Sequence, residues 1–237
     1  MRVSIHQPHY LPWLPYLGKI ALSDCFVILD DVEFTRNGWQ NRNKIKTAQG
    51  PLVLTAPVKQ KLGQFISQVE VADNGWRKKH WASLQQAYRK APYFAAYEAD
   101  VQGFYANPWP NLVDPCSAMI EWLLTTLGLS IKVVRSSTLK VTSTSTQRLV
   151  DIVQSVGGHS YLSGSHALQA YLDPQVFVQQ GMPLHLFDWS CPTYPQLHTG
   201  FTANLAVLDA LFNVGPELTR EIALQGSSHR VYGQDPA

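Results

Sequence analysis

The sequence predicts an α/β protein with a largely parallel sheet: a Rossmann-like three-layer N-terminal part followed by a more helical C-terminal part. Two observations lead to this prediction. Strand-like and helix-like segments alternate along the chain, which is typical of parallel sheets whose strands are connected by helices. One strand-like segment, residues 26–29, is apolar at every position, as expected for a strand covered on both faces.

The first half of the chain contains the clearest strands. Residues 2–6 alternate apolar and polar side chains and are followed by a proline-rich segment, which excludes a regular helix there. The polar residues 35–51 predict a loop. The expected strands of this half are residues 2–6, 26–29, 52–58 and 66–72, and the expected helices are residues 16–23, 75–106 and 112–127.

The second half alternates helices with shorter strands. A strand is expected within residues 130–138. The next helix has Thr146 as a suitable N-cap and ends at Gly157 and Gly158. A strand end, a Ser/Gly loop, another helix and a closing strand follow, and the last helix covers residues 201–215.

The composition predicts one globular domain over residues 1–222, with a polar, frayed tail over residues 223–237. Of the 237 residues, 45% are apolar and 15% are charged, which is typical of a folded domain and not of a disordered chain. The net charge of +2 provides no overall field that would attract nucleic acid. An anionic ligand therefore has to be bound by a local cluster of residues.

The sequence predicts a cytoplasmic protein. No stretch is apolar enough to span a bilayer, and the N-terminus shows no signal-peptide pattern. Cys25, Cys116 and Cys191 are far apart and form no CxxC motif, so neither a disulfide framework nor a structural zinc site is expected.

The segment after the first strand, "HQPHYLPW", is the first candidate for a functional role. Its prolines stiffen a loop that carries two imidazoles, and the spacing of His6 and His9 on a non-helical segment disfavours a shared metal ion. In the simplest interpretation the aromatic side chains only pack on the sheet. In the functional one, His6 or His9 performs acid–base chemistry at a substrate site. The other side chains assigned to that site are Gln7, Tyr10 and Trp13.

Two adjacent carboxylates, Asp30 and Asp31, follow the apolar strand. Neighbouring residues of a strand face opposite sides, so the two do not form a catalytic pair unless the strand has already ended. One interpretation is a solvated acid next to a capping acid. The alternative is that one carboxylate orients a histidine, holds a divalent cation with substrate phosphates, or accepts a proton from a substrate amine.

The basic segment "RNGWQNRNKIK" is the third candidate. A run of cations is usually a solvated surface, but here the cations alternate with amides and one indole. Guanidinium groups and amides suit phosphates and sugar hydroxyls, and an indole suits a ring. A phosphate or nucleotide-sugar site is therefore favoured over a plain loop. The substrate-binding residues assigned here are Arg36, Trp39, Asn41, Arg42, Asn43 and Lys44.

Two later segments complete the candidate set. The Ser/Gly loop around Ser163 offers free backbone N–H groups to an anion, and Gln196 lies in an aromatic, amide-bearing loop before the last helix. The string "SGS" does not match the GxSxG motif of hydrolases. Cys191 is more consistent with an inert cysteine than with a nucleophile.

The ordered motifs resemble those of the WbqC-like protein family over about residues 3 to 215. They are "QPHYLPW", "SDCFVILDDVEF" and "WQNRNKIK", followed by "SSTL", "TQRLVDI", "YLSG", "YLD", "YPQ" and "LAVLDALFN". One departure is Pro15, where the family pattern usually has glycine. The resemblance implies a role in the synthesis of O-antigen-type surface polysaccharides, in which a glycyl or other aminoacyl group is transferred to an amino sugar.

Three functions are compatible with these residues. In an acyl transferase, the basic segment holds the phosphates of a sugar nucleotide or activated donor, Trp13 or Trp39 stacks on a ring, and His6 or Asp30 takes the amine proton. In a nucleotidyltransferase, Asp30 or Asp31 holds Mg²⁺ and His9 stabilises the reacting phosphate. A non-catalytic partner in a polysaccharide-assembly complex is the third. The predicted ligand is a small molecule with a phosphate. No cofactor is specified apart from possible Mg²⁺, and the oligomeric state stays open.

Overall fold

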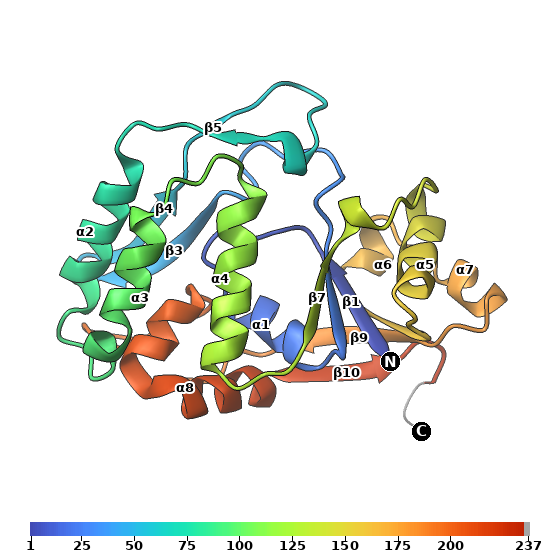
Figure 1. Cartoon of the computed structure of the whole chain (residues 1–237). Coiled ribbons are helices and arrows are strands. Elements are labelled where there is room, and N and C mark those ends of the chain that lie inside the picture. Colours follow the sequence, from blue (N-terminus) through green and yellow to red (C-terminus); the bar gives the residue numbers. More distant parts are fainter. Residues whose placement is uncertain (235–237) are drawn as a thin grey trace.

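The computed structural model describes residues 1–234 and has a six-stranded sheet at its centre (Figure 1). The strands lie in the order β10-β9-β8-β1-β2-β7, and every neighbouring pair is parallel except β9 and β10. Their bounds are β1 Arg2–His6, β2 Cys25–Ile28, β7 Lys132–Arg135, β8 Ser160–Gly164, β9 Leu184–Trp189 and β10 Ser227–Val231. The predicted α/β class with a largely parallel sheet is confirmed.

The order of the strands reverses beside β1. The chain runs from β1 outward to β2 and β7, and then returns to the other side of β1 to form β8 and β9. In open α/β sheets, ligands bind outside the carboxyl ends of the strands at such a reversal point. A ligand site is therefore expected at the carboxyl end of β1, next to β8.

Helices cover both faces of this sheet, which gives three layers. Alternate residues of β2 belong to different cores: Phe26 and Ile28 pack on one face, and Cys25 and Val27 on the other. The first face is covered by α1 (Leu14–Ala21), α4 (Val113–Thr126) and α8 (Val207–Gln225). The second is covered by α5 (Ser145–Ser155), α6 (Ala167–Ala170) and α7 (Pro174–Gln179).

The chain between β2 and β7 also forms a group of helices and short strands beside these three layers (Figure 1). It contains α2 (Trp76–Tyr88), α3 (Phe94–Ala106) and the hairpin of β3 (Arg42–Thr47) and β4 (Gly50–Thr55). A small ladder of β5 (Val58–Lys59) and β6 (Glu70–Val71) completes it. Its helices pack on α8, where the Phe94 and Phe212 rings lie 5.2 Å apart.

Several boundaries in the first half differ from the prediction. The expected polar loop of residues 35–51 contains β3, because backbone pairing with β4 holds a polar segment as a strand without an apolar face. The strand expected over residues 66–72 is a 3₁₀ turn (Ile66–Gln68) followed by β6. The expected helix over residues 75–106 is interrupted before α3, where Pro92 cannot continue α2.

The C-terminal predictions also need correction. The last helix continues beyond Gly215, whose φ of 81° produces a kink, and Pro216 begins the next turn. Residues 223–237 are not a frayed tail over their described part, because β10 pairs with β9 and covers that edge of the sheet. Residues 235–237 lie outside the described part of the chain. The N-cap of α5 is Thr144, and Thr146 instead accepts a hydrogen bond from the Asp173 N–H.

Candidate functional site

The carboxyl end of β1 carries a compact group of aromatic and basic side chains. His6 is the last residue of β1, and its ring lies 4.8 Å from that of His9. The Tyr16 ring, on the first turn of α1, stacks on His9 at 4.7 Å, and its hydroxyl donates to the Gln7 carbonyl at 3.1 Å. These contacts hold the proline-rich segment against the end of the sheet.

Pro15 is compatible with this arrangement. It lies in the first turn of α1, after the N-cap Trp13, where a backbone N–H has no partner within the helix. The residue of the segment that adopts a positive φ is Leu11, at 47°. The departure from glycine at position 15 therefore leaves the turn intact.

Lys19 is part of the same group, although the sequence did not single it out. Its side chain reaches from α1 to β1, where Nζ donates to the Ile5 carbonyl at 2.9 Å, and the residue is only 5% exposed. Burial lowers the pKa of Lys19 from 10.5 to about 7. The sequence did contain a signal for this burial. Lys19 is three residues after Tyr16 and next to Ile20, so it lies on the face of the short helix that packs on the sheet.

Both histidines are neutral at pH 7. Burial, followed by the nearby Lys19 and His9, lowers the pKa of His6 well below its usual value. Burial and Lys19 lower the pKa of His9 to about 3. His6 Nδ1 lies 3.1 Å from the Gln7 carbonyl, which can only accept, so Nδ1 carries the proton and Nε2 retains a lone pair.

The basic segment reaches this group through two tryptophans. Trp13 lies 6.3 Å from His9 and stacks on Trp39 at 5.9 Å. The cationic groups of Arg42 and Lys44, on β3, lie 5.6 and 5.4 Å from the Trp39 ring, within the range of cation–π attraction. The structure thus brings the opening segment and the basic segment together in one continuous array.

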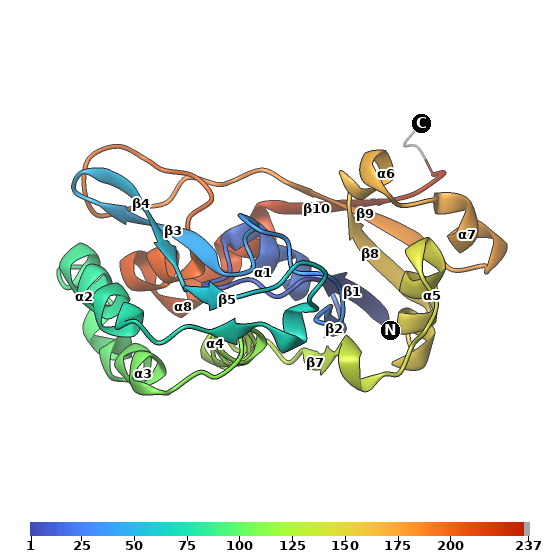
Figure 2. The ribbon, with the colours of Figure 1, turned by 90° about the horizontal axis from the view of Figure 1, so that it is seen from above.

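Side-chain amides also join these segments. Gln40 Nε2 donates to Gln7 Oε1 at 2.7 Å, and Gln40 Oε1 accepts from the Thr35 N–H. Arg36 is exposed and lies in the neighbouring turn. Viewed from above, the β3–β4 hairpin extends beside α1 and α8 (Figure 2).

Three predicted substrate-binding residues are instead part of the core. Tyr10 is completely buried, and its hydroxyl bonds to His80 at 2.8 Å and Tyr105 at 2.7 Å, so it is not open to a substrate as predicted. The amide of Asn41 donates to the Ala56 carbonyl and that of Asn43 to the Leu11 carbonyl. These two asparagines hold the hairpin and the opening segment in place.

The two aspartates converge instead of facing opposite sides, because β2 ends at Ile28 and both lie beyond it. The Ser136 hydroxyl lies within hydrogen-bond distance of both carboxylates, and Ser137 donates to Asp30 through its backbone N–H and its hydroxyl. Asp31 also pairs with Arg148 at 2.6 Å. Asp30 is 1% exposed, so its position supports a role in joining β2 to β7 and not the predicted proton transfer.

Ser163 and Gln196 lie in different places. Ser163, on β8, is buried beside the end of β1, at the reversal point of the sheet. Gln196 belongs to the long segment between β9 and α8, which runs along the hairpin (Figure 2). Its side-chain oxygen accepts from Lys46 Nζ at 3.2 Å and from the Thr202 N–H, and these contacts anchor that segment to β3.

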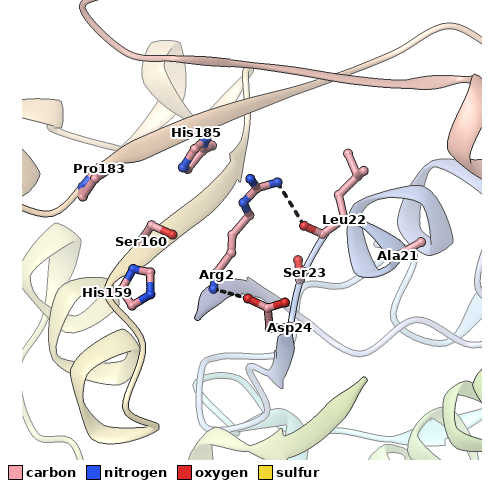
Figure 3. Close-up of a pocket in the computed structure, with 9 residues that line it drawn as sticks. All are labelled: Arg2, Ala21, Leu22, Ser23, Asp24, His159, Ser160, Pro183 and His185. Carbon is pink, nitrogen blue, oxygen red and sulfur yellow. Dashed lines mark hydrogen bonds between the residues drawn. The ribbon is translucent and has the colours of Figure 1, made fainter. Parts of the chain in front are cut away.

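A separate hollow of about 580 Å³ lies at the opposite, amino ends of β1 and β8 (Figure 3). Arg2, Asp24, His159 and His185 line it, and none of the predicted site residues does. Arg2 donates to the Leu22 carbonyl at the end of α1, and its backbone N–H donates to Asp24. These contacts satisfy the last turn of α1 and give the charged groups of the hollow a structural role.

Within residues 1–234, no three His, Cys, Asp or Glu side chains are placed to hold a metal ion. Over the same residues, no helix combines the length and apolar character needed to cross a membrane.

The strand order and the group at the end of β1 define a doubly wound α/β protein with its candidate site at the reversal point. The chain belongs to the WbqC-like protein family, whose model matches residues 7–221. It is 33% identical over 220 residues to "Uncharacterized protein Rv1507c" of Mycobacterium tuberculosis (strain ATCC 25618 / H37Rv). That alignment covers 91% of this chain and 95% of the relative. No solved structure matches the chain.

Proposed function

We propose that the protein is a transferase that moves an acyl or aminoacyl group, of the glycyl type, onto the amine of an amino sugar or sugar nucleotide. The reaction would serve the synthesis of surface polysaccharide of the O-antigen type, in the cytoplasm. The substrate amine reacts in its neutral form, because a protonated amine is not a nucleophile, and a base takes the proton that the nitrogen loses as the new bond forms.

The observation that carries the proposal is the state of His6. It is neutral, its Nδ1 proton is directed at the Gln7 carbonyl, and its Nε2 lone pair has no partner in the described part of the chain. In the proposed step, the amine nitrogen bonds to the acyl carbon and gives its proton to His6 Nε2. The bond between the acyl carbon and the donor's leaving group breaks, and the proton passes to that group.

The array on β3 supports the proposed binding of a phosphate-bearing substrate. Arg42 and Lys44 lie side by side on one face of β3, near Trp39, and form no ion pair within residues 1–234. Arg36 extends the positive charge at the exposed turn. Since Trp13 and Trp39 already stack on each other, a ligand ring would have to pack on their outer surfaces.

Nucleotidyl transfer is the second candidate, and the pairing of His6 with His9 favours it. In this reaction the two imidazoles, 4.8 Å apart after the first strand of a doubly wound sheet, would both act on one phosphate. The need for Mg²⁺ and a nucleoside triphosphate distinguishes this reaction from acyl transfer.

A thermal-stability screen tests the proposal. Nucleotides, nucleotide sugars and acyl donors are added with and without Mg²⁺, because a ligand that binds only the folded state raises the melting temperature. Acyl transfer predicts stabilisation by a nucleotide sugar without metal, and nucleotidyl transfer predicts stabilisation by a nucleoside triphosphate only with metal.

Variants identify the residues involved. We expect Arg42→Ala to abolish the ligand-induced shift, whereas the exposed Lys78→Ala, on α2, leaves it unchanged. We expect His6→Gln to retain binding and to lose transfer once a substrate pair is known. An unchanged shift in Arg42→Ala removes the basic segment from the site. No shift with any ligand favours a non-catalytic partner in a polysaccharide-assembly complex.

A further inference from the structure

The group at the end of β1 contains more hydrogen-bonding capacity than the protein satisfies. Lys19 has three N–H donors when protonated, and Ile5 is their one hydrogen-bond acceptor within residues 1–234. His9 is 5% exposed, and its buried Nδ1 has no partner. Ser4 is completely buried, and its hydroxyl has no partner either.

These groups lie on one side of β1. Val3 and Ile5 pack in the core on the α5 face, so the alternation of the strand turns Ser4 and His6 toward α1. Lys19 reaches β1 from α1, on that same side, and is close enough to His6 and His9 to lower the pKa of both.

No carboxylate balances this cluster. The ion pairs of residues 1–234 do not involve Lys19, His6 or His9. Asp30 and Asp31 form their hydrogen bonds and their ion pair with Ser136, Ser137 and Arg148. A buried ammonium without a counter-ion is unfavourable, and proteins normally pair such a charge or leave it neutral. With a pKa of about 7, Lys19 is half protonated at neutral pH, and this protonated fraction lacks a negative partner within residues 1–234.

We propose that Lys19 and His9, beside His6, form an oxyanion-binding site in which a carboxylate or phosphate group of the substrate supplies the counter-ion. The site lies at the reversal point of the sheet and is separate from the half-buried Arg42 and Lys44 of β3. The proposal deepens the proposed function and rests on it, because it places a second anionic group of the substrate next to the proposed base His6.

The anion also has a chemical consequence for His6. Without it, the positive charge of Lys19 opposes protonation of the imidazole. With it, the two charges offset each other, and His6 becomes a better proton acceptor. Substrate binding would thus prepare the base that the proposed transfer needs.

The test measures binding of inorganic phosphate and of acetate to the full-length chain at constant ionic strength set with chloride. The two anions represent a phosphoryl and a carboxylate source. Binding is followed by thermal shift in the wild type, Lys19→Met, Arg42→Ala and the exposed control Lys78→Met. Methionine has a similar length to lysine without the charge, so the variant removes the proposed counter-ion contact and little volume.

We expect Lys19→Met to weaken binding of the preferred anion about ten- to a hundredfold, the contribution of one charge-assisted hydrogen bond. Lys78→Met should bind as the wild type does. If Lys19→Met binds the anion normally, or if neither anion stabilises the wild type, the proposal is wrong. Loss of binding in Arg42→Ala alone would leave the proposed function standing and refute the role of Lys19.

A second measurement does not depend on any Lys19 variant being folded. The imidazole signals of His6 and His9 are followed by NMR as a function of pH, and are assigned with His6→Gln and His9→Gln. A saturating anion should raise the pKa of both rings in the wild type. Unchanged pKa values in the presence of bound anion would place that anion elsewhere and overturn the proposal.

Discussion

Replacement of Lys19 by methionine should change how the stability of the protein depends on pH. The pKa of Lys19 is about 7 in the folded chain and 10.5 in the unfolded chain. Between these values the unfolded chain binds more protons, so the free energy of unfolding rises with pH through that window. The side chain is 5% exposed, so solvent screens this effect little.

The magnitude follows from the proton count. Each pH unit contributes about 1.4 kcal/mol once the folded amine is neutral, and less near pH 7, where it is half protonated. From pH 7 to 9 the wild type should therefore gain about 2 kcal/mol from Lys19. For a chain of this size, such a gain corresponds to a rise of about 4–8 °C in melting temperature.

The assay is urea unfolding at several pH values between 7 and 9, for the wild type, Lys19→Met and the exposed control Lys78→Met. The difference between wild type and Lys19→Met cancels the other titrating groups. Lys19→Met should be the more stable protein at pH 7, and its advantage should shrink by about 2 kcal/mol by pH 9. Parallel pH profiles of these two proteins would show that Lys19 is an ordinary, solvated ammonium and refute the reasoning.

Three further predictions concern neighbouring side chains. The pKa of His9 is lowered to about 3, so the stability it contributes is present above pH 6.5 and is lost as pH falls below it; urea unfolding at pH 5 and 7 should show a drop in stability that is about 2 kcal/mol larger in the wild type than in His9→Gln, where His6 still contributes its own drop. Tyr10→Phe removes the hydroxyl that bonds to His80 and Tyr105, and should cost about 1–3 kcal/mol without changing any ligand-induced shift. Asp30→Ala leaves Ser136 with Asp31 as its remaining acceptor and removes the acceptor of the exposed Ser137; it should destabilise the fold by about 1–3 kcal/mol and leave anion binding intact, and loss of binding alone would restore Asp30 to the site.

The first two strands of the sheet could be predicted because local signals determine them. The apolar run of β2 and the prolines after β1 act over a few residues, and the carboxyl ends of parallel strands meet at one edge. Long-range pairing could not be predicted. The polar β3 and β10 are strands because they pair through backbone hydrogen bonds with β4 and β9. No pattern within β3 or β10 indicates this pairing.

The sequence indicated which types of side chain lie near the candidate site better than it indicated what each side chain does. His6 and Asp30 lie at the carboxyl ends of β1 and β2, but sequence alone does not show which polar groups already have partners. Asp30 and Tyr10 are satisfied by side chains from distant segments, Ser136 and Tyr105 among them. Lys19 was missed because its character depends on burial, which follows from the packing of α1 on β1 and not from its neighbours in sequence.

The two halves of the proposed site are fixed to each other before any ligand arrives. The Tyr10 N–H donates to the Gln40 carbonyl at 3.1 Å, and the Val207 N–H donates to the Pro12 carbonyl at 2.8 Å. The Lys44 carbonyl accepts from Ala206 at 2.9 Å, so the hairpin, the opening segment and α8 are joined by backbone bonds. A substrate that contacts both Arg42 and His6 would therefore meet a preorganised surface, and its binding energy would not be used to order loops. The packing that holds α1 on β1 also keeps Lys19 away from water, so its ammonium group either loses its proton or has its charge offset by a ligand.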